Sequence, residues 1–253
     1  MIWQLLLKTY QPILKILIIS IVIYGLIVIV WPLFWARLYS PTKPPISPGV
    51  IYNFPNPNQK SIFRAVVIGD STALGQGSDD VKKSFGYQYL LTKLELKTQN
   101  WSFENRAVSG VKIAEVLDNQ LGFEPVDLVM ISIGANDITG LTKPEEFRKS
   151  VKMLIGRLKT LAKQVIWLNI PDFVTSPILL LPLNYILSQR ELELNAILKN
   201  IVPKASYQLI DVYNEAREPF AKDPKLHFGV DGYHPSAAGY GVWVGVIQKN
   251  VKD

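Results

Sequence analysis

The chain of 253 residues contains no cysteine and only two histidines, His227 and His234. The lack of cysteine excludes disulfide bonds, thiolate nucleophiles and cysteine-ligated metal sites. The scarcity of histidine leaves two candidates for any reaction that needs an imidazole base. His227 has a proline rather than a carboxylate three residues before it, so we expect it to be a structural or surface residue.

The chain also has no block of lysine and arginine interleaved with aromatic residues, although its formal net charge is +6. Such a block is the usual sequence mark of a nucleic-acid interface. The positive charge is therefore interpreted as a mildly basic surface. We expect no nucleic-acid partner.

Charged residues are absent from residues 16–36, which read ILIISIVIYGLIVIVWPLFWA. About 20 apolar residues suffice to cross a bilayer core. Trp31, Trp35 and Tyr39 gather at the far end, as interfacial aromatic residues do. No small-residue cleavage site follows, which favours a retained single-pass anchor over a cleaved signal peptide. The short N-terminal tail favours an extracytoplasmic position for the rest of the chain, although the flanking basic residues barely discriminate between the two orientations.

Proline then sets the next boundary, because residues 40–60 hold six of the 17 prolines. That density leaves little room for a helix or a central strand and favours a stiff, extended linker. We therefore divide the chain into a tail and membrane anchor (1–39), a proline-rich linker (40–60) and one folded domain (61–253).

The folded domain alternates strand-like and helix-like segments. The expected strands are Arg64–Ile68, Trp101–Asn105, Asp127–Ile133, Gln164–Ile170 and Tyr207–Val212. The expected helices are Phe85–Lys97, Val111–Gln120, Pro144–Lys163, Leu183–Asn200 and Pro235–Val251. The repeated order predicts an α/β fold with a mostly parallel sheet and helices on both faces. Thr142 and Glu145 have the spacing of a capping box before the third helix.

Polar clusters follow these strands, at 69–71, 105–110, 134–137 and, after a further loop, 231–235. All strands of a parallel sheet end at one edge, so the clusters should converge. A serine needs a base to become a nucleophile, and His234 can accept the proton of Ser71. Asp231, three residues earlier, can hold the imidazole and stabilise its charged form. The backbone N–H groups of Ser71 and Gly110, with the Asn136 amide, can serve as an oxyanion hole.

Taken together, these clusters resemble the four sequence blocks of the SGNH (GDSL-type) hydrolases, in the family's order. The blocks are Gly69-Asp70-Ser71 with Gly75, Asn105 to Gly110, Gly134-Ala135-Asn136-Asp137, and Asp231-Gly232-Tyr233-His234-Pro235. The resemblance covers roughly Arg64 to Val251. It implies a flavodoxin-like α/β/α sandwich with a five-stranded sheet, together with ester hydrolysis.

The resemblance also implies roles for single residues. Ser71 matches the family's nucleophile, His234 its base and Asp231 its aspartate, while Gly110 and Asn136 match its oxyanion donors. We expect neither a metal nor a cofactor. The N-terminal span, which many soluble members lack, is a departure that leaves the substrate open.

Other polar residues at this edge are expected to be structural. Asp70 and Asp137 can accept backbone N–H bonds that shape their loops, and Ser109 is interpreted as a loop residue. Asp172 either lines the pocket or caps a turn. The apolar segment 174–186 is either core packing or a wall for an acyl chain or lipid surface.

Four functions compete. The leading one is a membrane-anchored serine esterase acting on a small-molecule, lipid or glycan ester, and the second passes the same acyl group to an envelope polysaccharide. A metallophosphoesterase would need more histidine ligands than the chain has. A non-catalytic tethered binding domain is disfavoured by the intact set of nucleophile, base and oxyanion donors.

Overall fold

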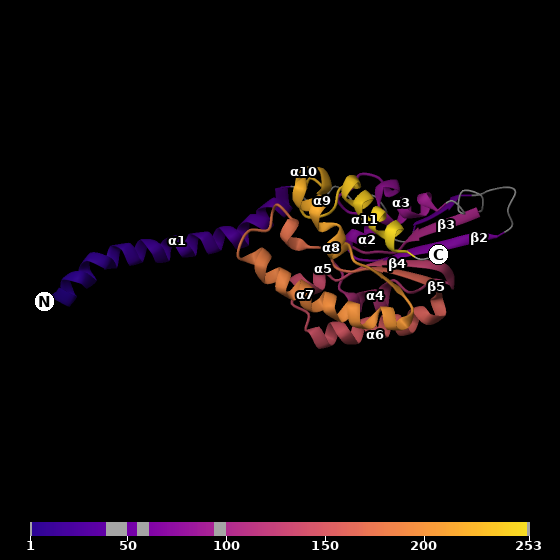
Figure 1. Ribbon diagram of the computed structural model, residues 1–253, viewed down its shortest axis with the longest axis horizontal. Coiled ribbons are helices and arrows are strands. Elements are labelled where there is room, and N and C mark those ends of the chain that lie inside the picture. The colour runs from indigo at the N-terminus through magenta and orange to yellow at the C-terminus, as the bar shows by residue number, and fades with distance from the viewer. Residues whose placement is uncertain (1, 39–49, 55–60, 94–99, 252–253) are drawn as a thin grey trace.

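The computed structural model describes residues 2–38, 50–54, 61–93 and 100–251. Its centre is a six-stranded sheet with the order β1-β3-β2-β4-β5-β6, covered by helices on both faces (Figure 1). The strands are β1 Val50–Phe54, β2 Ile62–Gly69, β3 Asn100–Asn105, β4 Val126–Ser132, β5 Ala162–Leu168 and β6 Gln208–Ile210. The five predicted strands form the parallel part of this sheet, and the α/β/α sandwich is confirmed.

The sixth strand, β1, comes from the segment predicted to be a linker. It pairs antiparallel with β3, with Tyr52 opposite Phe103. Its residues lie between Pro48 and Pro55, and a proline-free stretch of this length can form an edge strand. The rest of the predicted linker, residues 40–49 and 55–60, lies outside the described residues.

The helices follow the predicted alternation. Those of the domain are α2 Ser71–Leu74, α3 Phe85–Thr92, α4 Ile113–Asn119, α5 Ala135–Thr139, α6 Pro144–Leu161, α7 Leu183–Ile201, α8 Val212–Glu215, α9 Arg217–Lys222, α10 Pro224–His227 and α11 Ala237–Asn250. The predicted capping box on Thr142 is wrong. Lys143 is the N-cap of α6, because Pro144 occupies the first helical position and fixes where the helix starts.

The sheet separates two apolar clusters. Along β2, Ala65 and Val67 belong to the cluster under α3 and α11, whereas Val66 and Ile68 belong to the one under α4, α6 and α7. Successive side chains of a strand point to opposite faces, so a strand buried on both faces reads as one apolar run. This double burial explains why the sequence Ala65 to Ile68 contains no polar residue.

The N-terminal helix α1 spans Ile2–Leu38 and stands apart from this core. Its segment Tyr10–Trp31 is long and apolar enough to cross a membrane, and little of it is buried in the protein. The uncharged run predicted at 16–36 lies within α1. The helix meets the domain at the end where the parallel strands terminate, beside the connection between β5 and α7 (Figure 1).

Candidate active site

The first polar cluster sits where β2 passes into α2. Asp70 is the N-cap of α2, and its Oδ1 accepts a hydrogen bond of 2.9 Å from the backbone N–H of Thr72. This cap places Ser71 at the first helical position. Gly69 has a φ of +138°, and a Cβ there would lie 1.9 Å from the carbonyl oxygen of Ser132. Only glycine therefore allows β2 to turn into α2 at this point.

Three side chains from opposite ends of the chain meet at this edge. His234 Nε2 lies 2.9 Å from Ser71 Oγ, and His234 Nδ1 lies 2.6 Å from Asp231 Oδ2. The other carboxylate oxygen, Oδ1, accepts the backbone N–H groups of Tyr233 at 2.9 Å and His234 at 3.0 Å. Burial is the largest influence on Asp231 and opposes its ionisation, but the hydrogen bond and charge of His234, together with the two backbone N–H groups, outweigh burial and hold the pKa of Asp231 below the ordinary value.

The loop that carries His234 is fixed by its own backbone. The N–H of Gly229 donates to the carbonyl of His234 at 2.8 Å, and Phe228 forms an antiparallel bridge with Pro235. Gly77 packs so closely against this loop that a Cβ on it would lie 2.8 Å from His234 Cβ. Sequence reasoning missed Gly77, whose only signal is a second glycine two residues after Gly75.

The expected oxyanion donors follow β2, β3 and β4, whose carboxyl ends share one edge of the sheet. Within the part of the chain that the structure describes, the backbone N–H groups of Ser71 and Gly110 have no hydrogen-bond partner. The side-chain nitrogen of Asn136 donates to the carbonyl of Val111 at 3.0 Å, next to Gly110. Because that nitrogen carries two protons, one can orient the amide while the other remains for a ligand.

The other polar residues of the blocks hold loops together. Asp137 Oδ2 accepts the backbone N–H of Ile113 at 3.0 Å, which joins the third block to the start of α4. Burial raises the pKa of Asp137 to about 6, and it also raises that of Asp70. Ser109 Oγ donates to Gln76 Oε1 at 2.9 Å. The expected structural contacts of Asp70, Asp137 and Ser109 are therefore present.

Two further side chains hold the backbone in place, by hydrogen bonds, where β2 and β3 end. Asn105 donates to the carbonyl of Ala73 at 2.9 Å and accepts the N–H of Ala107 at 3.0 Å. Gln120 bonds both the N–H and the carbonyl of Gly69, at 2.7 and 2.8 Å. Nothing in the sequence around Gln120 indicated this role, because its partner lies 51 residues away.

His227 lies outside the triad, as expected. Its Nδ1 is 2.9 Å from the carbonyl oxygen of Asp223, and its ring lies against that of Phe220. Among the residues described, no group of three or more histidine or acidic side chains is placed to hold a metal ion.

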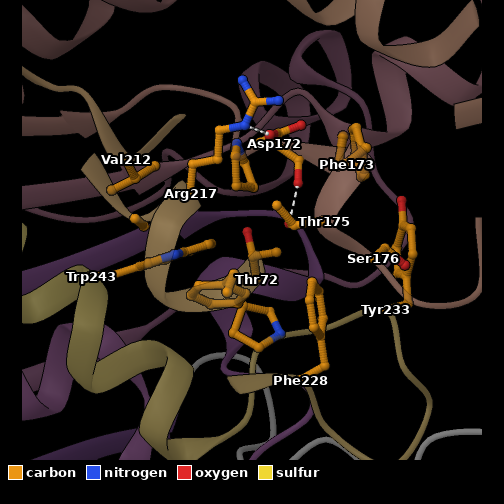
Figure 2. A pocket seen from close by; sticks show the side chains of 15 residues that line it. Thr72, Asp172, Phe173, Thr175, Ser176, Val212, Arg217, Phe228, Tyr233 and Trp243 are labelled. Carbon is orange, nitrogen blue, oxygen red and sulfur yellow. Dashed lines mark hydrogen bonds and ion pairs between the residues drawn. The ribbon is translucent and has the colours of Figure 1, made fainter. Parts of the chain in front are cut away.

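A small apolar cavity of about 40 Å³ adjoins the triad. Its walls include Thr72 and Tyr233, the immediate chain neighbours of Ser71 and His234, and Figure 2 shows Phe228 and Trp243 closing other sides. The cavity is bordered by an ion pair in which Arg217 Nε lies 2.9 Å from Asp172 Oδ2. Asp172 also caps the turn Phe173–Thr175, so both expectations for this residue hold.

A second buried carboxyl group supports this region from α7. Glu191 is fully buried, and its Oε2 accepts the backbone N–H of Phe173 at 3.3 Å. Burial, with a smaller contribution from the charge of Asp172, raises the pKa of Glu191 to about 10. The group is therefore neutral in the folded protein at pH 7. Asn195, one turn further along α7, bonds the N–H and carbonyl of Ile170 at 2.9 Å each.

Glu191→Gln should stabilise the fold, and the gain should grow with pH. A carboxyl group with a raised folded pKa stabilises fully below its unfolded pKa of 4.5 and loses that contribution as pH rises toward about 10. At pH 7 the expected gain is about 3 kcal/mol, because each unit of pKa difference is worth about 1.4 kcal/mol. Urea unfolding at several pH values checks this, with exposed Glu193→Gln as the control. A gain independent of pH would contradict it.

Comparisons with known proteins identify the family and the fold. The model of the GDSL-like lipase/acylhydrolase family matches residues 67–242. A GDSL-like esterase of Mycobacterium tuberculosis, Rv1075c, is 24% identical over 192 residues, which are 74% of this chain and 61% of that protein. The chain thus spans less than two thirds of that relative's length.

Solved structures show the same fold. The acetylxylan esterase Axe2 from Geobacillus stearothermophilus superimposes with a TM-score of 0.54 at 17% identity, covering 76% of this chain and 95% of that one. A member of the lipolytic G-D-S-L family from Veillonella parvula gives a TM-score of 0.56 at 17% identity, covering 75% of this chain and 97% of that one. With its family match over most of the folded domain, this chain belongs to the GDSL-like lipase/acylhydrolase family.

Proposed function

We propose that this protein is a membrane-anchored serine esterase that cleaves carboxylic esters through an acyl-enzyme on Ser71. The observation that carries the proposal is the 2.9 Å contact between Ser71 Oγ and His234 Nε2, with Asp231 on the far side of the ring. A hydroxyl, an imidazole and a carboxylate in this order form the arrangement that activates a serine nucleophile.

The reaction proceeds in two balanced steps. Ser71 Oγ attacks the acyl carbon while its proton passes to His234 Nε2, and that proton then leaves with the alcohol as the ester C–O bond breaks. Water next attacks the acyl-enzyme, gives a proton to His234, and the acid departs as the proton returns to Ser71 Oγ. In both steps, the negative charge on the carbonyl oxygen faces the N–H groups of Ser71 and Gly110 and the Asn136 amide.

Asn136→Ala should lower the rate of ester hydrolysis by about 10²–10³-fold, because one oxyanion donor is lost. The effect should fall on kcat and kcat/KM together, since the donor acts on charge that develops in the transition state. Steady-state kinetics with a soluble chromogenic ester measures it, and Asn200→Ala on the exposed end of α7 serves as the control. Near-normal turnover by a folded Asn136→Ala protein would remove Asn136 from the mechanism.

Hydrolysis is distinguished from acyl transfer by the products. With a glycan acceptor in the reaction, an esterase releases the free acid, whereas an O-acyltransferase gives an acylated sugar. We expect the free acid. Accumulation of acylated sugar would replace hydrolysis by transfer and leave the acyl-enzyme step intact.

The anchor is proposed on the apolar stretch Tyr10–Trp31 of α1. Full-length protein should stay with membranes after alkaline washing, with α1 still attached to the domain. Recovery of a soluble, shortened chain would instead identify α1 as a cleaved signal sequence.

A further inference from the structure

The connection between β5 and α7, together with the first turn of α7, exposes apolar side chains to an unusual degree. Ile178 and Leu179 are buried in the core, but Leu181 is 61% exposed, Tyr185 60% and Ile186 53%. We call the last three the exposed patch. A gathered set of apolar side chains on a surface marks a site of interaction with a protein or a membrane. The sequence left open whether this segment packs in the core or forms a wall for an acyl chain or lipid surface, and in the structure part of it is buried and part is exposed.

The apolar helix α1 contacts the exposed patch directly. The hydroxyl of Tyr24 donates to the carbonyl oxygen of Leu181 at 2.8 Å. On the following turn of α1, Val28 is only 4% exposed, so other parts of the chain cover that face of the helix. The backbone of the patch at Leu181 is therefore bound to α1, while its apolar side chains stay exposed.

The position of this contact along α1 determines how deep the carbonyl of Leu181 would lie in a bilayer. Tyr24 lies seven residues before Trp31, where the apolar stretch ends. With a rise of 1.5 Å per residue, this separation is about 10 Å along the helix axis. When Tyr10–Trp31 crosses a bilayer, the carbonyl of Leu181 consequently lies below the level of the headgroups. Amphipathic elements that lie in a membrane interface bury their apolar side to about 5–10 Å, which agrees with this depth.

The same segment is joined to the loop of the triad. Ser176 Oγ donates to the carbonyl of Gly232 at 2.8 Å. The ring of Phe173 stacks on that of Tyr233, with the two ring centroids 5.7 Å apart. Val230, next to Asp231, is 71% exposed. Figure 1 shows α1 leaving the domain from this edge of the sheet. The edge that carries the triad therefore faces the side from which α1 extends.

We propose that the exposed patch is seated in the leaflet next to the domain, and that the active site takes its ester from a lipid of that bilayer. The proposed position of the patch in the leaflet is argued from α1 and the patch alone. The proposal of a lipid substrate also rests on the proposed esterase function. The occupant is lipid because the patch is bound to a helix whose apolar stretch matches a bilayer, at a depth that only lipid occupies.

The position of the patch in the leaflet is tested by measuring how deep single fluorescent labels lie in a bilayer. The chain has no cysteine, so Leu181→Cys, Ile186→Cys and the control Ile62→Cys each provide one site for a fluorescent label. Ile62 is also well exposed, at 56%, but begins β2 at the opposite edge of the sheet. The full-length variants are placed in vesicles of phosphatidylcholine and phosphatidylglycerol. Quenching by nitroxide carried on lipid chains is then compared with quenching by iodide in the water.

We expect lipid nitroxide to quench labels at 181 and 186 and iodide to leave them bright, with the reverse result at 62. Labels at 181 that respond to iodide would overturn the proposed position of the patch. Labels shielded from both quenchers would also overturn it, because a second copy of the chain or α1 would then cover the patch.

The substrate is tested by a ratio of activities. The ratio compares cleavage of a long-chain ester in vesicles with cleavage of a soluble acetyl ester. This ratio should fall by about tenfold or more in Ile186→Asp and Leu181→Asp, because a charge is costly in hydrocarbon. Ile62→Asp should leave the ratio unchanged. An unchanged ratio in the patch variants would overturn the lipid substrate. Labelling of Ser71 by a fluorophosphonate in detergent, which needs no bilayer, reports separately on the esterase.

Discussion

Ser71→Ala should reduce ester hydrolysis by about 10⁴–10⁶-fold and leave the folded domain intact. The hydroxyl is the group that forms the acyl bond, so no neighbouring side chain replaces it once it is removed. The residual rate should come from the oxyanion donors and from substrate binding, which persist without the nucleophile. Among the described residues, Ser71 Oγ is hydrogen-bonded to His234 and to no other residue, so its loss costs the fold little.

Kinetics with a soluble ester and urea unfolding of the same preparation measure the two effects. Ser150→Ala, on α6 and away from the triad, is the matched control and should retain full activity. A Ser71→Ala protein that is folded and still hydrolyses esters within tenfold of the parent would exclude the acyl-enzyme mechanism.

Asp231→Asn should lower hydrolysis by about 10³–10⁴-fold although the replacement has the same shape. The reason lies in the two carboxylate oxygens. Oδ1 accepts two backbone N–H groups, from Tyr233 and His234, so the amide oxygen of asparagine must take that position. The amide nitrogen then faces His234 Nδ1 and donates to it. That bond puts the ring proton on Nε2, which can no longer accept the proton of Ser71.

The tautomer can be measured directly. Nitrogen NMR of histidine-labelled protein should show the proton of neutral His234 on Nδ1 in the parent and on Nε2 in Asp231→Asn. Asp118→Asn, an exposed change on α4, controls for the loss of one negative charge. A variant that loses activity with an unchanged tautomer would contradict the positioning role of Asp231.

The sequence indicated the residues of the candidate site but not the residues that support it. Ser71, His234 and Asp231 could be recognised because short local patterns follow buried strands, and parallel strands bring such patterns to one edge. Gln120 and Glu191 could not be found in this way. Each acts on backbone groups far along the chain, and only the packed helices α4 and α7 bring them to their partners.

The elements were predicted with the same limits. Buried strands such as β2 read as apolar runs because both faces are covered, whereas β1 is short, lies at an edge and is surrounded by prolines. Its pairing with β3 depends on a sheet edge that the sequence does not display. The apolar run of α1 could be read directly, but its contact with Leu181 could not, because a single hydrogen bond over 157 residues leaves no local pattern.

The proposed mechanism requires that Ser71 forms a covalent bond to the acyl carbon of the substrate. The most direct measurement treats the full-length protein with a fluorophosphonate and locates the adduct by mass spectrometry of its peptides. We expect one adduct, on Ser71, that is absent from Ser71→Ala and much slower to form in Asp231→Asn. An unmodified Ser71, or an adduct on another serine, would contradict it.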